Sequence, residues 1–198
     1  MDIVKAFKER NIKAYLVKNR EAAKKKAISL IPRDWTIAFG GSMTLNEVGI
    51  MEELRKGGYK LIDRESISSA FTRHFAMKAS MNCGVFLSSA NAVTEDGQIV
   101  NVDGWGNRVN SIAYGPETVI LVVGKNKIVK DLDAALKRLR EISPRNTKRL
   151  MKKTPCAETG ICTDCRSPDR ICNVLSIIQF QNDPNRMHVI IADEELGY

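Results

Sequence analysis

The amino-acid sequence predicts an α/β fold with a mostly parallel, Rossmann-like sheet. Short apolar runs, of the kind that form strands buried on both faces, alternate with longer segments whose apolar residues recur at helical spacing. This alternation is typical of βαβ units, in which a helix connects two parallel strands. Two β-prone runs around Asp96-Gly97 add a hairpin, and four clustered cysteines add a cysteine-rich segment near the C-terminus.

Local signals place each element in the first third of the chain. Asn19 is suited to cap a helix over residues 20–30, and Pro32 stops that helix. The apolar run at 35–39 ends in glycines, and the helix that follows it ends at Gly57-Gly58. The predicted elements are helices at 1–10, 20–30 and 44–56, and strands at 12–17, 35–39 and 59–62.

The rest of the chain continues the same alternation. Ile67, Phe71, His74 and Phe75 fall on one stripe of a predicted helix over 67–77, and leucines in register predict a helix over 131–142. The run at 118–123 is the most strand-like in the chain. Further strands are predicted at 85–87, 174–180 and 187–191, with the hairpin over 92–100.

Length and composition favour one folded domain over residues 1–198. With 43% hydrophobic and 27% charged residues, the chain is unlike disordered or fibrous proteins. No apolar run approaches the roughly 18 residues that span a bilayer, and the first residues do not resemble a signal peptide. We therefore expect a cytoplasmic protein that is not inserted in a membrane.

The formal net charge of +8 is concentrated in residues 137–153. This segment has eight Lys and Arg residues and one acid, Glu141, which gives +7 and leaves about +1 for the other 181 residues. It lacks the interleaved aromatic residues of single-strand nucleic-acid sites, so nucleic acid is not the expected partner. We expect its charge to surround the nearby cysteines first and to form a docking surface second.

Gly40-Gly41-Ser42-Met43-Thr44 lies between a predicted strand and a predicted helix. Backbone N–H groups and the helix dipole favour an anion at such a corner, and the hydroxyls of Ser42 and Thr44 add donors. Ligands of open α/β sheets bind outside the carboxyl ends of strands, where this loop lies. It matches neither common nucleotide-binding loop, and it is only a near match to the serine-hydrolase elbow. An ordinary capped turn is the alternative.

Other polar residues at strand ends and turns complete the predicted site. Carboxylates beside a bound anion can act as general acids or bases, and solvated turn residues are the alternative. Asp103 lies in a glycine-rich turn with Asn107 and Arg108. Lys125 follows the strand predicted at 118–123. The acid–base candidates are Glu47, Glu95 and Asp103, and the ligand-binding candidates are Gly40, Gly41, Ser42, Thr44, Asn107, Arg108 and Lys125.

Cys156, Cys162, Cys165 and Cys172 lie in a cysteine-rich insertion over residues 155–173. Thiolates at this density can hold zinc or an iron–sulfur cluster, and the neighbouring cations should lower the thiol pKa values. Disulfides or free thiols are the alternatives, and disulfides are rare in cytosolic proteins. Cys83 stands alone after a helix, so we expect it to be buried and inert.

Five stretches form a combination that is more specific than any one of them. They are residues 39–49 (FGGSMTLNEVG), 88–97 (SSANAVTEDG), 101–109 (NVDGWGNRV), Gly115-Pro116 and 124–127 (GKNK). Together they resemble the LUD-domain family of lactate-utilisation proteins, also called the DUF162 family. The tail with its four cysteines resembles the short, single-domain members of that family.

The resemblance implies a fold like that of the superfamily of ribose-5-phosphate isomerase, glucosamine-6-phosphate deaminase and the CoA-transferases. It adds Asn91 to the ligand-binding candidates. It also implies a link to the oxidation of L-lactate to pyruvate by a multiprotein iron–sulfur system, whose other subunits would be partners. No motif matches the catalytic glutamate of the CoA-transferases, so transferase chemistry is not implied. The sequence leaves open whether the chain forms a homo-oligomer.

Two functional hypotheses follow. The first is an enzyme or an accessory subunit that binds a small anionic metabolite, a carboxylate or a sugar phosphate, at the glycine-rich loop. The second is a non-catalytic, metal-bearing binding or sensor module whose basic segment docks a partner. Anion binding that depends on Ser42 and Thr44 would indicate the first, and a steep salt dependence of binding to DNA or RNA would indicate the second.

Overall fold

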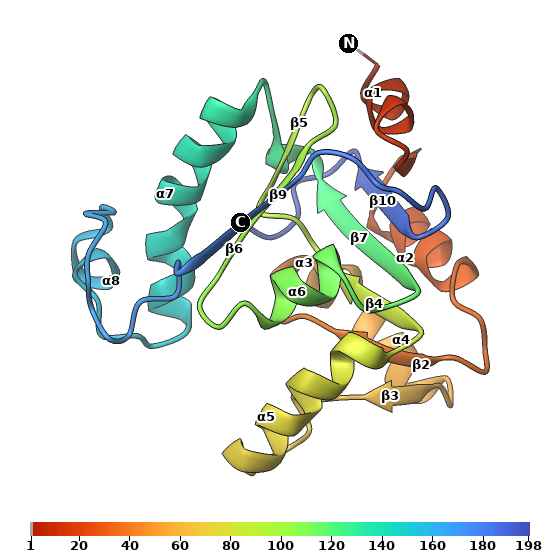
Figure 1. The fold of residues 1–198 in the computed structure, drawn as a ribbon, viewed down its shortest axis with the longest axis horizontal. Coiled ribbons are helices and arrows are strands. Elements are labelled where there is room, and N and C mark those ends of the chain that lie inside the picture. The colour runs from red at the N-terminus through yellow and green to blue at the C-terminus, as the bar shows by residue number, and fades with distance from the viewer. Residues whose placement is uncertain (1) are drawn as a thin grey trace.

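Two β-sheets organise the protein, whose residues 2–198 are described in a computed structural model (Figure 1). The larger sheet has six parallel strands, in the order β1 (Lys13–Val17), β10 (Met187–Ala192), β7 (Thr118–Gly124), β4 (Val85–Ser88), β2 (Thr36–Phe39) and β3 (Lys60–Ile62). The smaller sheet has the order β8 (Ile128–Val129), β5 (Ala92–Thr94), β6 (Ile99–Asp103) and β9 (Val174–Ile178). The predicted α/β fold with a mostly parallel sheet is confirmed.

Helices connect the parallel strands, as the sequence predicted. They are α1 (Ile3–Glu9), α2 (Arg20–Ser29), α3 (Met43–Val48), α4 (Ile50–Lys56), α5 (Ala70–Ala79), α6 (Asn107–Ala113), α7 (Leu132–Arg149) and α8 (Pro155–Thr159), with 3-10 turns at Ser80–Asn82 and Lys125–Lys127. No helix within residues 2–198 has the length and apolar content needed to cross a membrane.

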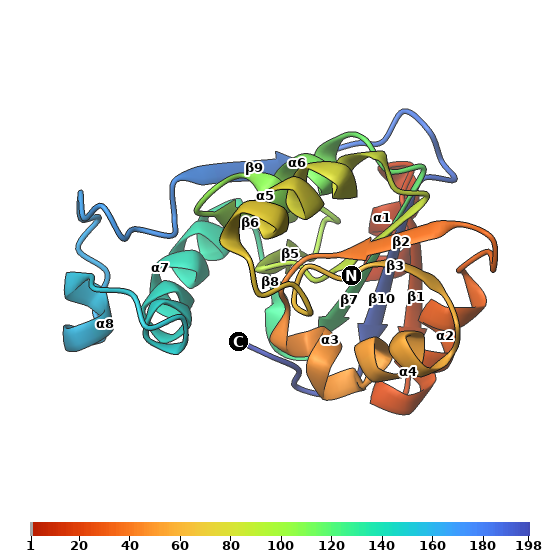
Figure 2. The same ribbon diagram turned by 90° about the horizontal axis from the view of Figure 1, so that it is seen from below.

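The elements stack in four layers (Figure 2). Helices α2, α3 and α4 cover one face of the six-stranded sheet. The other face packs against α1, α6 and one side of the smaller sheet, whose second side packs against α7. Alternation along the strands produces this arrangement, because Ile37 and Phe39 of β2 face the first helical layer whereas Ala38 faces the opposite side.

Several elements differ from the expectation. The helix predicted over 44–56 is two helices, because Gly49 adopts a left-handed conformation with φ of 74°. On α5, Phe71 and Phe75 are exposed, so the predicted stripe does not face the core. The strand predicted over 174–180 belongs to the smaller sheet, where β9 pairs with β6 of the hairpin.

Helix α7 continues seven residues beyond the predicted end at 142 and passes through Pro144. Proline removes one helical N–H, which ordinarily favours a helix end. Here the buried face continues through Ile142, Pro144 and Thr147, so packing outweighs the lost hydrogen bond. The extension carries much of the basic segment 137–153 along one helix.

The parallel pairing brings the carboxyl ends of six strands to one edge of the larger sheet. Strands β3 and β4 lie on opposite sides of β2, so the direction of winding reverses between β2 and β4. Such a reversal leaves a crevice between the loops that follow the two strands, and open α/β sheets bind ligands there.

The layered core predicts different stabilities for two matched substitutions. Phe7 of α1 is fully buried against the larger sheet, whereas the side chain of Phe71 on α5 is 74% exposed. We expect Phe7→Ala to lower the free energy of unfolding by about 3–5 kcal/mol, and Phe71→Ala to change it by less than about 1 kcal/mol. Urea denaturation followed by circular dichroism measures both. Equal losses would contradict this assignment of the two faces.

Candidate functional site

A cavity of about 360 Å³ lies at the carboxyl edge of the larger sheet, beside the β2–β4 reversal. Four of its walls are loops that follow parallel strands, and the others come from the turn before α6, the end of α7 and the C-terminal segment. The lining includes Gly41, Ser42 and Met43 after β2, Arg64 and Glu65 after β3, Ser89, Ala90 and Asn91 after β4, Lys127 after β7, Asp103, Trp105, Asn107 and Arg108 around the α6 turn, Asn146, Arg149 and Lys152 at the α7 end, and Tyr198.

The predicted glycine-rich loop forms part of this wall. Ser42 caps α3, because its hydroxyl accepts a hydrogen bond from the backbone N–H of Leu45 at 3.3 Å. Gly40 lies so close to Arg108 that a Cβ atom would meet its side-chain carbons at 3.1 Å. Neither His74 nor His188 lines the cavity, so Ser42 has no imidazole base there. The loop therefore shapes the site and is also an ordinary helix cap.

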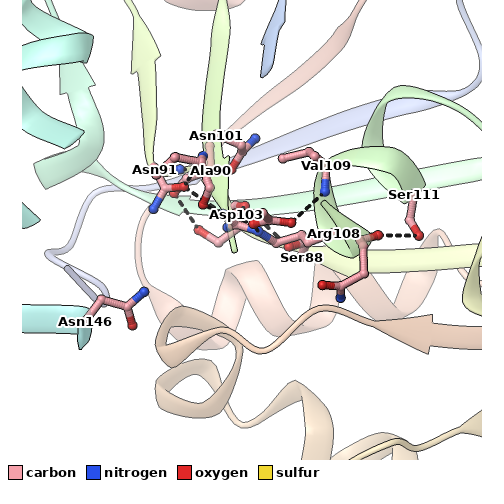
Figure 3. A network of polar contacts seen from close by, with 12 residues as sticks. Ser88, Ala90, Asn91, Asn101, Asp103, Arg108, Val109, Ser111 and Asn146 are labelled. Atoms are coloured by element: carbon pink, nitrogen blue, oxygen red, sulfur yellow. Dashed lines mark hydrogen bonds and ion pairs between the residues drawn. The ribbon is translucent and has the colours of Figure 1, made fainter. Parts of the chain in front are cut away.

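Asp103, Arg108 and Asn91 form one buried polar network (Figure 3). Arg108 Nε donates to Asp103 Oδ1 at 2.8 Å, and Arg108 Nη2 donates to Asn91 Oδ1 at 2.7 Å. The second oxygen of Asp103 accepts from the backbone N–H of Val109 at 2.9 Å. Both oxygens of Asp103 are thus occupied by protein donors. This carboxylate orients Arg108, and the acid–base role expected of Asp103 stays a prediction.

Lys127 is the buried cation of the cavity, and it was not among the predicted residues. It ends the turn after β7 and donates from Nζ to Thr44 Oγ1 at 2.7 Å and to Ser89 Oγ at 2.9 Å. Burial, followed by the charges of Arg138 and Arg108, lowers the pKa of Lys127 to about 7, although Glu47 acts in the opposite direction. Thr44, which the sequence predicted as a ligand-binding residue, is fully buried and accepts a hydrogen bond from Lys127. It therefore positions Lys127.

Five predicted residues do not line the cavity: Gly40 and Thr44, which contact the lining residues Arg108 and Lys127, and Lys125, Glu95 and Glu47. The turn after β7 points Lys125 away, and its Nζ pairs with Asp193 Oδ1 at 2.9 Å. Glu95 is exposed at the tip of the hairpin. Glu47 accepts a hydrogen bond from the backbone N–H of Gly197 at 2.7 Å, so it fastens the C-terminal segment beside Thr44.

Arg64, Arg149 and Lys152 are lining cations that the sequence analysis missed. Arg64 follows β3, so the rule that ligands bind at carboxyl ends could have identified it. Asn107, with its amide oriented for hydrogen bonding, accepts from Arg64 Nη1 at 2.9 Å. Arg149 and Lys152 reach the site only because α7 continues past Pro144. Two residues of the basic segment 137–153 therefore line the cavity, although we expected the charge of this segment to surround the cysteines first.

The four clustered cysteines occupy two environments. Cys156 is buried on α8, where its Sγ lies 3.3 Å from Thr154 Oγ1, whereas Cys162, Cys165 and Cys172 are half-buried in the following loop. Burial raises the pKa of Cys172, and Cys162 and Cys165 raise it further, although Arg170 opposes them. Arg170, which lies outside the basic segment 137–153, lowers the pKa of Cys172, but burial outweighs its charge and the net shift is upward.

In this arrangement, no group of three or more His, Cys, Asp or Glu side chains among residues 2–198 is placed to hold a metal ion. We therefore assign no metal-dependent step to the protein. The iron–sulfur cluster or zinc stays a prediction, which metal and sulfide analysis of protein purified without oxygen can test. Cys83 is buried as expected, and burial raises its pKa to about 11.

Comparison with known proteins identifies a family and structural neighbours. A sequence model of the LUD domain matches residues 1–192. No curated protein matches the chain. A crystal structure of a DUF162 family protein from Deinococcus radiodurans is similar over 96% of this chain and 96% of its own, with a TM-score of 0.55 and 14% identity. A ribose 5-phosphate isomerase from Plasmodium falciparum matches 56% of this chain and 52% of its own, with a TM-score of 0.34 and 13% identity.

The domain match includes every loop that lines the cavity except the C-terminal segment with Tyr198. The structural similarity to the DUF162 protein covers 96% of the chain and shows a shared fold. The stretches that suggested the family therefore lie within the matched region, and several of them form the cavity wall. The chain belongs to the LUD-domain family.

Proposed function

We propose that the protein binds a small anionic metabolite, a carboxylate or a sugar phosphate, in the cavity at the carboxyl edge of its larger sheet. One observation carries this proposal. Arg64, Lys127 and Arg149 line the cavity, and none of the three forms an ion pair with any carboxylate of residues 2–198. Cations without carboxylate partners around an open cavity favour an anionic ligand.

The size and the polar groups of the cavity support a small ligand. Ligand cavities commonly have volumes of about 300–1,000 Å³, and this one lies near the lower limit. Arg64 and Arg149 offer planar guanidinium groups, which suit the paired oxygens of a carboxylate or phosphate. Arg108 contributes less to the ligand, because Asp103 and Asn91 already occupy it. A role in lactate utilisation would make L-lactate one such ligand.

A matched pair of arginines on α7 tests the anion site. Arg149 lines the cavity, whereas Arg140 is exposed on the same helix and does not line it. We expect Arg149→Ala to weaken anion binding about tenfold or more, because charge-assisted hydrogen bonds typically contribute about 1.5–3 kcal/mol. Arg140→Ala removes the same charge and should leave the affinity within about twofold. Titration calorimetry with L-lactate and with ribose 5-phosphate measures both variants.

The outcome also separates the ligand classes. Binding of L-lactate alone would identify a carboxylate site, and binding of ribose 5-phosphate alone would identify a phosphate site. Equal affinities of the two variants would place the anion outside the cavity and contradict the proposal, as would the absence of binding by either probe.

The pH dependence of binding tests the contribution of Lys127. The pKa of Lys127 is lowered to about 7, so this group is charged below that pH and neutral above it. The carboxylate of L-lactate stays ionised throughout this range. We therefore expect binding to be roughly tenfold tighter at pH 6 than at pH 8, which is the scale of one charge-assisted hydrogen bond. In Lys127→Met the dependence should disappear; an unchanged pH dependence in that variant would contradict this role.

A further inference from the structure

We infer that Lys127 is an amine nucleophile that forms an imine with the carbonyl carbon of a small anionic aldehyde or ketone bound in the cavity. The inference rests on the proposed anion site and extends it, because it assigns the ligand a carbonyl group and the protein a covalent step. Lys127 is suited to this role by its hydrogen bonds, its electrostatic surroundings and its position among the lining cations.

The hydrogen bonds around Nζ fit a neutral amine. Thr44 Oγ1 can donate to the carbonyl of Leu196 at 3.3 Å, and Ser89 Oγ can donate to the carbonyl of Ala90 at 3.3 Å. Both hydroxyls are then free to accept from Lys127, as the Nζ distances of 2.7 and 2.9 Å indicate. Within residues 2–198, Nζ has no third hydrogen-bond partner. A neutral amine uses its two N–H groups in this way and keeps its lone pair unused.

The electrostatic surroundings favour the same state. Lys127 has a relative exposure of 5%, and the cations Arg138 on α7 and Arg108 on α6 both disfavour its charged form. Glu47 on α3 opposes them but is exposed and bonded to Gly197. The pKa of Lys127 is consequently about 7, so about half of the amine is neutral at neutral pH. Desolvation beside other cations is a recognised way to activate a lysine toward carbonyl compounds.

The remaining cations define which carbonyl compounds would react. Arg64 and Arg149 line the same cavity and can hold a carboxylate or phosphate. A ligand with an aldehyde or ketone close to that anionic group can then present its carbonyl carbon to Nζ. The nitrogen lone pair attacks this carbon, and the carbonyl π electrons move to oxygen. The oxygen then leaves with the two amine protons as one water molecule, and a C=N bond remains. The step needs no oxidant or reductant.

Lys125 is a matched internal control for this reactivity. It lies two residues from Lys127, is exposed, and has its pKa raised by the hydrogen bond and charge of Asp193. At pH 7, an amine with a pKa near 7 has a neutral fraction about three orders of magnitude larger than that of an ordinary lysine. The two lysines lie in one short segment but differ strongly in the fraction of neutral amine, which is the form that attacks a carbonyl carbon.

The experiment treats the full chain with glyoxylate and sodium cyanoborohydride at pH 7, and peptide mapping by mass spectrometry then locates the reduced adduct. We expect Lys127 to be labelled at least about tenfold faster than Lys125, since the thousandfold difference in neutral amine exceeds the loss from burial. The labelling rate of Lys127 should rise from pH 6 to pH 8 and then level off. Equal or slower labelling of Lys127 overturns the inference, and this comparison requires no variant.

Two further measurements separate this inference from the proposed function. Acetaldehyde has the carbonyl but no anionic group, so Arg149→Ala should slow labelling of Lys127 by glyoxylate and leave labelling by acetaldehyde unchanged. Calorimetry with L-lactate and ribose 5-phosphate on the same protein reports the anion site alone. Anion binding without an adduct at Lys127 overturns the imine and leaves the proposed function standing. Labelling of Lys127 by acetaldehyde without any anion binding overturns the proposed function and, with it, the anionic substrate class.

Discussion

The buried ion pair between Asp103 and Arg108 is the constraint on which the site depends. Both side chains are almost fully enclosed, and a charge left alone there would be strongly unfavourable, so each requires the other. Arg108 also bonds to Asn91 after β4 and packs against Gly40 after β2. A single guanidinium therefore joins the smaller sheet and α6 to the carboxyl edge of the larger sheet. The cavity lies where these parts meet.

The other cations surround the cavity for different reasons. Lys127 is held by hydroxyls from two loops and is mostly desolvated, which makes its charge sensitive to pH near neutrality. Arg149 is exposed at the end of a long helix and presents a planar guanidinium group. The site thus combines a guanidinium, suited to holding an anion, with a titratable amine, suited to proton transfer or covalent chemistry.

Much of the framework was predictable because its signals are local. The hairpin follows from Asp96-Gly97, and the start of α2 follows from Asn19, whose side chain caps that helix as expected. The site was predicted only in part. Lys125 and Lys127 occur in the same loop, and the direction of a 3-10 turn decides which of them enters the cavity. The helix end predicted at 142 was wrong, because the buried face of α7 continues through Pro144 and Thr147, and the cations at the end of α7 were missed for that reason.

Periodicity, or a turn within a few residues, is enough to predict the α/β class, the parallel sheet, the hairpin and the loop at the carboxyl end of β2. Long-range packing is what makes both oxygens of Asp103 accept hydrogen bonds, buries Lys127, and buries Cys156 while leaving the other three clustered cysteines half-buried. These properties arise where residues far apart in the sequence meet. Burial, hydrogen-bond partners and pKa values depend on those neighbours, and no local pattern specifies them.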